Sequence, residues 1–148
     1  NVYLYMVGRD INFENKELSS YINDLKIKKK IFLLKEQKNL KEFYNGIDFL
    51  ILASHSESFP NVIAESMLCS TPVLSSDAGC SKKIINNFGF IMKNNDYQSI
   101  FKNLRKTINL LKYKKNKWKF LKKNSRLQIK KNFSIPIMAN AYLSNWVF

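Results

Sequence analysis

Two glutamates, Glu57 and Glu65, stand eight positions apart across Pro60 in the stretch SESFPNVIAE. Glu57 lies in a polar run, whereas Glu65 interrupts a segment that is otherwise apolar. An unpaired carboxylate in apolar surroundings is energetically costly, so such a residue is a candidate for binding a ligand or a cation. The pair therefore indicates a binding site built around this stretch.

The segment after Pro60 is predicted to be a helix that is apolar around most of its circumference. Only Glu65 and Ser66 are polar among the residues that follow Asn61 in its first two turns. A helix that is apolar nearly all round is typically buried, so we expect Glu65 to need a partner. That partner is either a lysine in a structural ion pair or a ligand that donates hydrogen bonds.

The entrance of this helix is suited to an anion. A strand is predicted at 48–53, and the loop 54–60 leads from its carboxyl end into the helix. Free backbone N–H groups on residues near Phe59, Asn61 and Val62 form a natural cradle for phosphate. With Glu57 just before the cradle and Glu65 about one turn beyond it, a diphosphate at the helix tip would have a carboxylate near each end.

Short apolar runs alternate with helical patterns as far as residue 96. Strands are predicted at 1–8, 30–34, 48–53, 72–75 and 89–92, and helices at 15–27, 39–46, 61–70 and 81–85. This alternation is typical of an α/β fold with a doubly wound parallel sheet, which binds ligands at the carboxyl ends of its strands. A long amphipathic helix is predicted from residue 97, with further helix that Pro136 interrupts.

The charge is concentrated in this C-terminal helical tail. Residues 1–96 carry 12 Lys and Arg against 11 Asp and Glu, whereas residues 97–148 carry 13 Lys and Arg and no acidic residue. The basic residues of the tail have three interpretations: a solvated helix face, docking to an anionic membrane surface, and nucleic-acid binding. Nucleic-acid binding has no recognised motif to support it. The two cysteines have no metal-ligand or disulfide spacing, and no apolar run is long enough to span a bilayer. These features predict a cytoplasmic protein. If the tail docks to a membrane, the protein is expected to be peripheral on the inner face of the cell membrane.

The stretch SHSESFPNVIAESMLCSTPVLSSDAG (54–79) resembles the C-terminal, nucleotide-sugar-binding domain of the family 4 (group 1) glycosyltransferases of the GT-B fold. The hallmark of that domain is two glutamates separated by seven residues, followed by a run with the pattern A-x-G-x-P-V-V-x-[ST]-D-x-G. Residues 3–34 resemble its opening strand, glycine turn, helix and second strand, and residues 89–108 resemble a later strand and helix. The resemblance covers nearly the whole chain and implies the Rossmann-like half of a GT-B fold with a C-terminal helical tail.

The resemblance also implies roles for individual residues. Glu65 would bind the ribose hydroxyls, and Glu57 would face the donor sugar at the reacting centre as the catalytic residue. Asp77 and Gly79 are interpreted as residues that shape a loop. The remaining substrate-binding residues implied are Ser58, Phe59, Pro60 and Asn61 for the sugar and diphosphate, Lys35 to Gln37 for the base, and Gly8 for close backbone approach.

The chain departs from the family pattern at Ser58 and Ser70, which replace glycines, and at Cys80. The family's basic pair would precede Asn1, and the N-terminal acceptor domain is absent. Residues 1–148 are therefore expected to be a single donor-binding domain, with an α/β core over 1–96 and the basic tail over 97–148. No Asp-x-Asp motif occurs, in keeping with the metal-independent chemistry that the resemblance implies.

The expected function is the donor-binding half of a retaining, metal-independent hexosyltransferase that builds a bacterial surface polysaccharide, such as capsule, or lipopolysaccharide. The donor is expected to be a UDP-sugar with no further cofactor, and the isolated piece is expected to be inactive. The expected partners are the nucleotide-sugar and the missing domain, with an anionic membrane surface as a further option and no nucleic acid. The alternative is a non-catalytic α/β module that binds a membrane surface or nucleic acid through its basic helices; a response-regulator-like nucleotide sensor is disfavoured because its acidic cluster is missing.

Overall fold

The computed structural model describes residues 2–146, and it divides the chain into two compact units, Asn1–Leu40 and Lys41–Phe148. Three residues lie outside the described residues: Asn1, the first residue of the predicted opening strand, and Val147 and Phe148, the last two of the predicted terminal segment.

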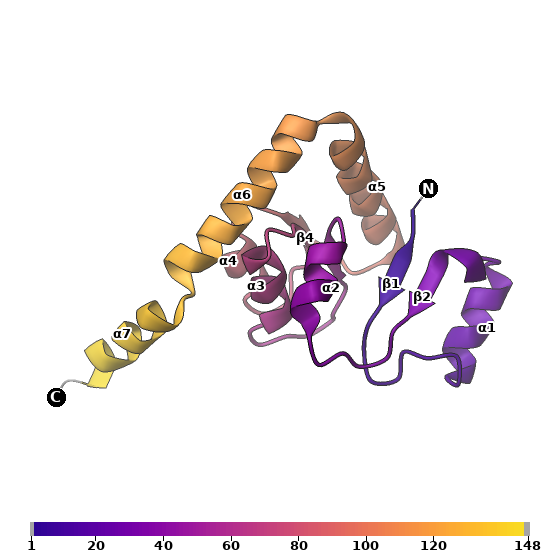
Figure 1. Cartoon of the computed structure of the whole chain (residues 1–148), viewed down its shortest axis with the longest axis horizontal. Coiled ribbons are helices and arrows are strands. Elements are labelled where there is room, and N and C mark those ends of the chain that lie inside the picture. Colours follow the sequence, from indigo (N-terminus) through magenta and orange to yellow (C-terminus); the bar gives the residue numbers. More distant parts are fainter. Residues whose placement is uncertain (1, 147–148) are drawn as a thin grey trace. The chain divides into compact units, whose positions relative to one another are not determined.

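The first unit is a parallel strand pair joined by a helix (Figure 1). Its elements are β1 (Leu4–Met6), α1 (Lys16–Asp24), the short 3-10 helix η1 (Lys28–Lys30) and β2 (Ile31–Leu33). The Asn15 side chain caps α1 by accepting a hydrogen bond of 3.1 Å from the N–H of Leu18. The strands pair in parallel with Leu4 opposite Ile31, so the crossover through α1 is a βαβ connection.

The second unit continues the alternation of helices and parallel strands. Its elements begin with α2 (Leu40–Gly46), whose first residue belongs to the first unit, and continue with β3 (Leu50–Leu52), α3 (Asn61–Leu68), β4 (Val73–Ser76), α4 (Ser81–Ile85), β5 (Phe90–Met92), α5 (Tyr97–Tyr113), α6 (Lys115–Asn132) and α7 (Ile135–Trp146). The strands form one sheet in the order β3-β4-β5, with Leu50 opposite Val73 and Leu74 opposite Phe90. The predicted α/β fold with parallel strands is confirmed.

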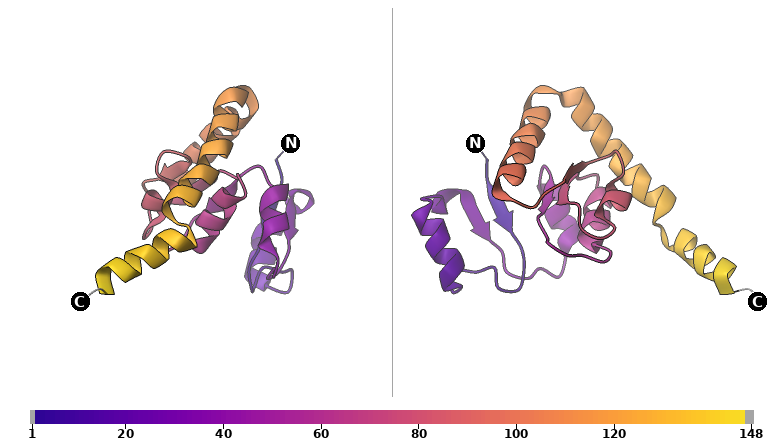
Figure 2. Two further views of the ribbon diagram at one scale, coloured as in Figure 1. Left: turned by 60° about the vertical axis from the view of Figure 1, so that its left-hand side comes forward. Right: turned by 180° about the vertical axis from the view of Figure 1, so that it is seen from behind.

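The core of the second unit lies between the sheet, α3, α4 and α6. All four residues of the central strand β4 are buried, as expected for a parallel strand covered on both faces. The core cluster consists of Ile63, Met67, Val73, Ile84, Ile85 and Ile129. Helix α6 packs against α3, α4 and α5, so the predicted basic tail is also part of the core (Figure 2).

Helix α6 contributes one buried stripe, Trp118, Leu121, Ser125 and Ile129, at spacings of three and four residues. The sequence predicted a break in the helical tail at Pro136, and this prediction is wrong. The tail breaks at Phe133 and Ser134, and Pro136 is the second residue of α7. Proline is tolerated there because the N–H groups of a first helical turn have no intrahelical acceptor. Among residues 2–146, every helix is too short or too polar to cross a bilayer.

Helix α3 ends in a Schellman motif that demands an unusual backbone conformation. The N–H of Thr71 bonds to the carbonyl of Ser66 at 3.0 Å, and that of Ser70 bonds to Met67 at 2.9 Å. Ser70 therefore has a φ of 62°, in the left-handed region that favours glycine. This is the position at which the sequence carries serine in place of the family's glycine, so the substitution leaves a strained residue at the helix end.

Replacing Ser70 with glycine should stabilise the chain, because glycine adopts this conformation without the steric cost of a Cβ atom. We expect Ser70→Gly to raise the free energy of unfolding by about 0.5–1 kcal/mol, or the melting temperature by about 2–4 °C. Thermal denaturation measures the change. Ser70→Ala keeps the Cβ atom and is the matched control; equal stabilisation by both variants would contradict the conformational explanation.

Candidate functional site

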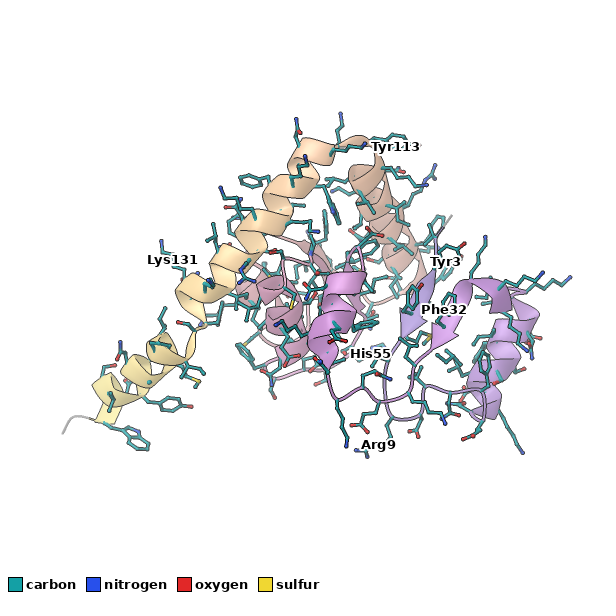
Figure 3. The ribbon with its side chains drawn as sticks, viewed as in Figure 1. Tyr3, Arg9, Phe32, His55, Tyr113 and Lys131 are labelled. Carbon is teal, nitrogen blue, oxygen red and sulfur yellow. The ribbon has the colours of Figure 1, made fainter. Side chains whose placement is uncertain are left out.

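The predicted site centres on the loop between β3 and α3. This loop leaves the carboxyl end of β3 and contains Glu57, Ser58 and Phe59 before it reaches Pro60. Glu57 is half-buried, whereas Ser58 and Phe59 are exposed. His55, labelled in Figure 3, is an exposed residue of the same loop. The structure thus brings the predicted sugar-binding and diphosphate-binding residues together at one end of the sheet.

The N-terminus of α3 has unsatisfied backbone donors. Its cap residue is Pro60, which has no side-chain acceptor and makes no capping hydrogen bond. The N–H of Ile63 bonds to the carbonyl of Pro60 at 3.0 Å. The N–H groups of Asn61 and Val62 belong to the first turn, where no carbonyl precedes them in the helix. Two donors at the positive end of the helix dipole are therefore available to an anion.

Neighbouring strand ends hold the β3–α3 loop in place through its backbone carbonyls. Each of three carbonyls in the loop accepts a hydrogen bond from a different segment of the second unit. The bonds are Asn95 Nδ2 to Ala53 O at 2.8 Å, Ser76 Oγ to Ser54 O at 2.6 Å, and Cys80 N to Ser58 O at 3.0 Å. Fixing the backbone in this way orders the loop before a ligand arrives, which lowers the entropic cost of binding.

Gly79 allows the closest of these approaches. Its φ is +53°, and a Cβ atom there would lie 2.1 Å from the carbonyl oxygen of Glu57 and 2.6 Å from that of Ser58. Real Cβ atoms are not found so close to backbone atoms, so only glycine fits where the β4–α4 turn packs against the β3–α3 loop. The predicted loop-shaping role of Gly79 is confirmed, and the segment it shapes is the one that carries Glu57.

The prediction that α3 is buried on nearly all sides is wrong. Its buried residues are Ile63, Ser66 and Met67, while Asn61, Glu65 and Leu68 form an exposed stripe. The sheet, α4 and α6 cover only part of the helix, so its apolar composition does not translate into complete burial. Glu65 is consequently an exposed carboxylate, and the argument that burial alone forces it to find a partner does not hold.

Glu65 does have a partner, which is a tyrosine hydroxyl and not a lysine. Tyr44 on α2 donates a hydrogen bond from its hydroxyl to Oε2 of Glu65 at 3.0 Å. Tyr44 is only 3% exposed. Burial raises the pKa of the Tyr44 hydroxyl, and the hydrogen bond to Glu65 and the negative charge of that carboxylate raise it further. The hydroxyl therefore remains a donor across the physiological pH range.

The remaining predicted residues lie in the first unit, at the carboxyl ends of β1 and β2. The N–H of Gly8 bonds to the carbonyl of Lys35 at 3.0 Å, so the two turns are joined through their backbones. Lys35 has a φ of 54°, and the side-chain amide of Gln37 donates to the carbonyl of Leu34. The structure thus brings Gly8 and Lys35 together, with Gln37 two residues beyond.

The basic tail presents its charge to solvent. All ten Lys and Arg residues between positions 112 and 131 are exposed. A hollow of ≈ 650 Å³ at the α5–α6 junction is lined by Lys112, Tyr113, Lys114, Lys115, Asn116 and Lys117, and includes none of the predicted donor-site residues. Over residues 2–146, no group of three or more His, Cys, Asp and Glu side chains is placed to hold a metal ion.

Sequence reasoning missed the residues that support the loop and its carboxylate from a distance. Tyr44 is 21 positions from Glu65, and Asn95 is 42 positions from Ala53. Neither belongs to a recognisable local motif, because its contact exists only after the helices and strands have packed. The predicted helix at 39–46 did contain Tyr44, but no pattern in it indicated that its hydroxyl would meet Glu65.

Comparison with known proteins identifies the same family that the motif resembles. The family described as glycosyl transferases group 1 matches residues 1–133. The capsular polysaccharide biosynthesis glycosyltransferase CapM of Staphylococcus aureus is 28% identical over 111 residues, which is 74% of this chain and 29% of CapM.

Solved structures match the fold over almost the whole chain. A glycosyltransferase from Rickettsia africae matches with a TM-score of 0.84 and 25% identity over 97% of this chain and 39% of its own. Anabaena HepE in complex with UDP matches with a TM-score of 0.84 and 21% identity over 97% of this chain and 40% of its own, and a HepE complex with UDP-glucose is also similar. The chain spans less than half the length of each of these proteins, and its fold is that of the C-terminal half of GT-B glycosyltransferases.

Substitution of Gly79 should disturb the site through the loop it contacts. The new Cβ atom in Gly79→Ala must displace the Glu57 carbonyl, so we expect a loss of about 2–3 kcal/mol in the free energy of unfolding. Urea denaturation measures this loss. Gly46→Ala is the control, since nothing lies within 4 Å of the added atom and alanine suits a helix end. Equal effects of the two substitutions would contradict the close approach at Gly79.

Proposed function

The chain belongs to the glycosyl transferases group 1 family, and from this premise we propose that it binds the nucleotide-sugar donor of a metal-independent, retaining glycosyltransferase. The observation that carries the proposal is the arrangement around α3. Glu65, fixed by Tyr44, lies one turn beyond a helix N-terminus with free donors, and Glu57 lies on the loop just before it. A ribose, a diphosphate and a sugar require these groups in this order.

Each part of the donor has a chemical counterpart in this arrangement. The carboxylate of Glu65 accepts hydrogen bonds from the ribose hydroxyls. The N–H groups of Asn61 and Val62 bind the diphosphate and stabilise the negative charge that develops on it as the sugar departs. Glu57 orients the sugar, and the anchored backbone of Ser58 to Pro60 shapes its binding surface. The hydroxyl that receives the sugar belongs to an acceptor molecule, which is proposed to bind outside these 148 residues.

Uridine diphosphate is the proposed nucleotide, and a hexose the proposed sugar. HepE, which shares the fold, has been crystallised with UDP and with UDP-glucose. CapM, which acts in capsular polysaccharide biosynthesis, supports a role in bacterial surface glycan synthesis. The proposed roles of Gly8, Lys35 and Gln37 in holding the nucleotide remain predictions from the family resemblance. These 148 residues alone are proposed to bind donor without transferring it.

The exposed basic face of α6 supports a second binding partner, an anionic membrane surface. Lysines there are interspersed with the exposed side chains of Phe120 and Leu127, and Tyr113, the last residue of α5, is also exposed. Basic residues near an anionic bilayer contribute about 1 kcal/mol each, and apolar side chains can enter its interface. This face would bring a transferase to membrane-associated acceptors. Binding to phosphatidylglycerol vesicles that falls with salt would support this partner, and equal binding to neutral phosphatidylcholine vesicles would contradict it.

Nucleotide titrations test the donor site directly. UDP, GDP, ADP and CMP are titrated by calorimetry at low and high salt into the parent chain and into Glu65→Gln. We expect one nucleotide, UDP, to bind selectively and to lose about tenfold in affinity in the variant, since hydrogen bonds to a charged carboxylate are among the stronger ones. Binding at this site should persist at high salt.

Glu17→Gln removes an exposed carboxylate from α1 and is the matched control, with an expected affinity equal to that of the parent. Equal binding of all four nucleotides that disappears at high salt and ignores Glu65 would contradict the proposal. It would instead support the alternative of a polyanion-binding module acting through its basic helices.

A further inference from the structure

We propose that Tyr44 is a positioning residue for nucleotide recognition, holding the Glu65 carboxylate in the orientation that accepts the ribose hydroxyls. This inference rests on the proposed function and adds a residue to it. Tyr44 lies on α2, outside the glutamate motif. Its side chain is linked to the proposed site through the hydrogen bond from its hydroxyl to Glu65.

Tyr44 is well suited to fix another side chain because it is itself immobile. Its side chain is 3% exposed, and its ring lies 5.9 Å from that of Phe43 in an edge-to-face arrangement. Its backbone carbonyl accepts a hydrogen bond of 2.7 Å from the buried hydroxyl of Thr71. Thr71 is the last residue of the Schellman motif that ends α3, so the same junction fixes both the end of α3 and the backbone that carries Tyr44.

Glu65, in contrast, is exposed to solvent. Its side chain lies on the exposed stripe of α3, where a glutamate samples several rotamers in water. The hydrogen bond of 3.0 Å from the Tyr44 hydroxyl selects one of them. It also leaves the second carboxylate oxygen, and the remaining lone pair of the first, to accept from two neighbouring hydroxyls of a ribose. The carboxylate is thereby ordered before the nucleotide arrives.

This arrangement predicts that Tyr44 affects recognition of the ribose hydroxyls and nothing else in the nucleotide. The suitable probes are the ribonucleoside diphosphates UDP, GDP and ADP, each beside its dideoxy counterpart, which lacks both hydroxyls. The ratio of the two affinities isolates the contribution of the ribose hydroxyls. A change that only loosens the fold weakens both members of a pair alike and leaves this ratio unchanged.

Calorimetric titrations compare the parent chain with Tyr44→Phe, Glu65→Gln and Thr107→Val. We expect the parent to prefer the ribonucleotide and Glu65→Gln to abolish this preference. Tyr44→Phe should reduce the preference about fivefold, the order expected for losing one orienting hydrogen bond, with dideoxynucleotide binding unchanged. Thr107→Val removes another buried threonine hydroxyl, whose hydrogen bond of 2.9 Å goes to the carbonyl of Asn103 within α5, and is the matched control. It should lower the melting temperature and leave the preference intact.

The possible failures are distinguishable. A preference that Glu65→Gln abolishes and Tyr44→Phe leaves intact overturns the role of Tyr44 alone. A parent with no preference, or one that Glu65→Gln does not change, overturns the ribose assignment of Glu65 and this inference with it. Absence of binding by any of the nucleotides overturns the proposed function as well.

Should Tyr44→Phe fail to fold, the parent chain still provides a test by NMR of isotope-labelled tyrosine rings. Tyr44 is the one buried tyrosine of the seven, all of which lie within residues 2–146, so a soluble paramagnetic agent broadens the other six resonances and identifies it. Saturating ribonucleotide should shift this resonance more than the dideoxy form does. Equal shifts from the two would overturn the inference.

Discussion

The close packing of Gly79 against the backbone of Glu57 is the constraint on which the candidate site depends. Gly79 lies in the turn between β4 and α4, and Glu57 lies in the loop between β3 and α3. Only glycine allows the two segments to pack so closely, since a Cβ atom at position 79 would lie 2.1 Å from the Glu57 carbonyl oxygen. Hydrogen bonds from Asn95, Ser76 and Cys80 to the same loop then act on a backbone that is already confined. The loop is thus ordered by the fold itself, as a preorganised electrostatic site requires.

The chemistry of the site follows from two groups that keep hydrogen-bonding capacity for a ligand: the backbone N–H groups at the start of α3 and the carboxylate of Glu65. Pro60 cannot cap α3 with a side chain, so the helix keeps donors for an anion. Glu65 is exposed, and a single buried tyrosine holds it without neutralising its charge. Positive backbone and negative carboxylate therefore lie one helical turn apart, a separation that suits a molecule with phosphates at one end and hydroxyls at the other. The basic residues of α6 face solvent and are not needed for this arrangement.

The sequence predicted the order and type of the elements well because apolar periodicity and glycine positions are local properties. The loop-shaping role of Gly79 was predicted for the same reason, whereas the roles of Glu57 and Glu65 in binding a donor stay predictions. The prediction from the sequence was wrong where burial had to be inferred: the apolar composition of α3 suggested a covered helix, yet only one side of it is covered and Glu65 is exposed. The role of Tyr44 could not be predicted, because Tyr44 lies 21 positions from Glu65 and only tertiary packing brings the two side chains together. The departure at Ser70 was visible in the sequence, but its strained φ of 62° was not.

Binding of the nucleotide at the start of α3 can be tested by mapping where UDP contacts the chain, using amide NMR spectra recorded at high salt. We expect the largest shifts on the N–H groups of Asn61 and Val62, smaller shifts around Glu65, and no response from the lysines of α6. Shifts confined to residues 112–131, with those of α3 unmoved, would overturn the donor site at α3 and would assign nucleotide binding to the basic tail.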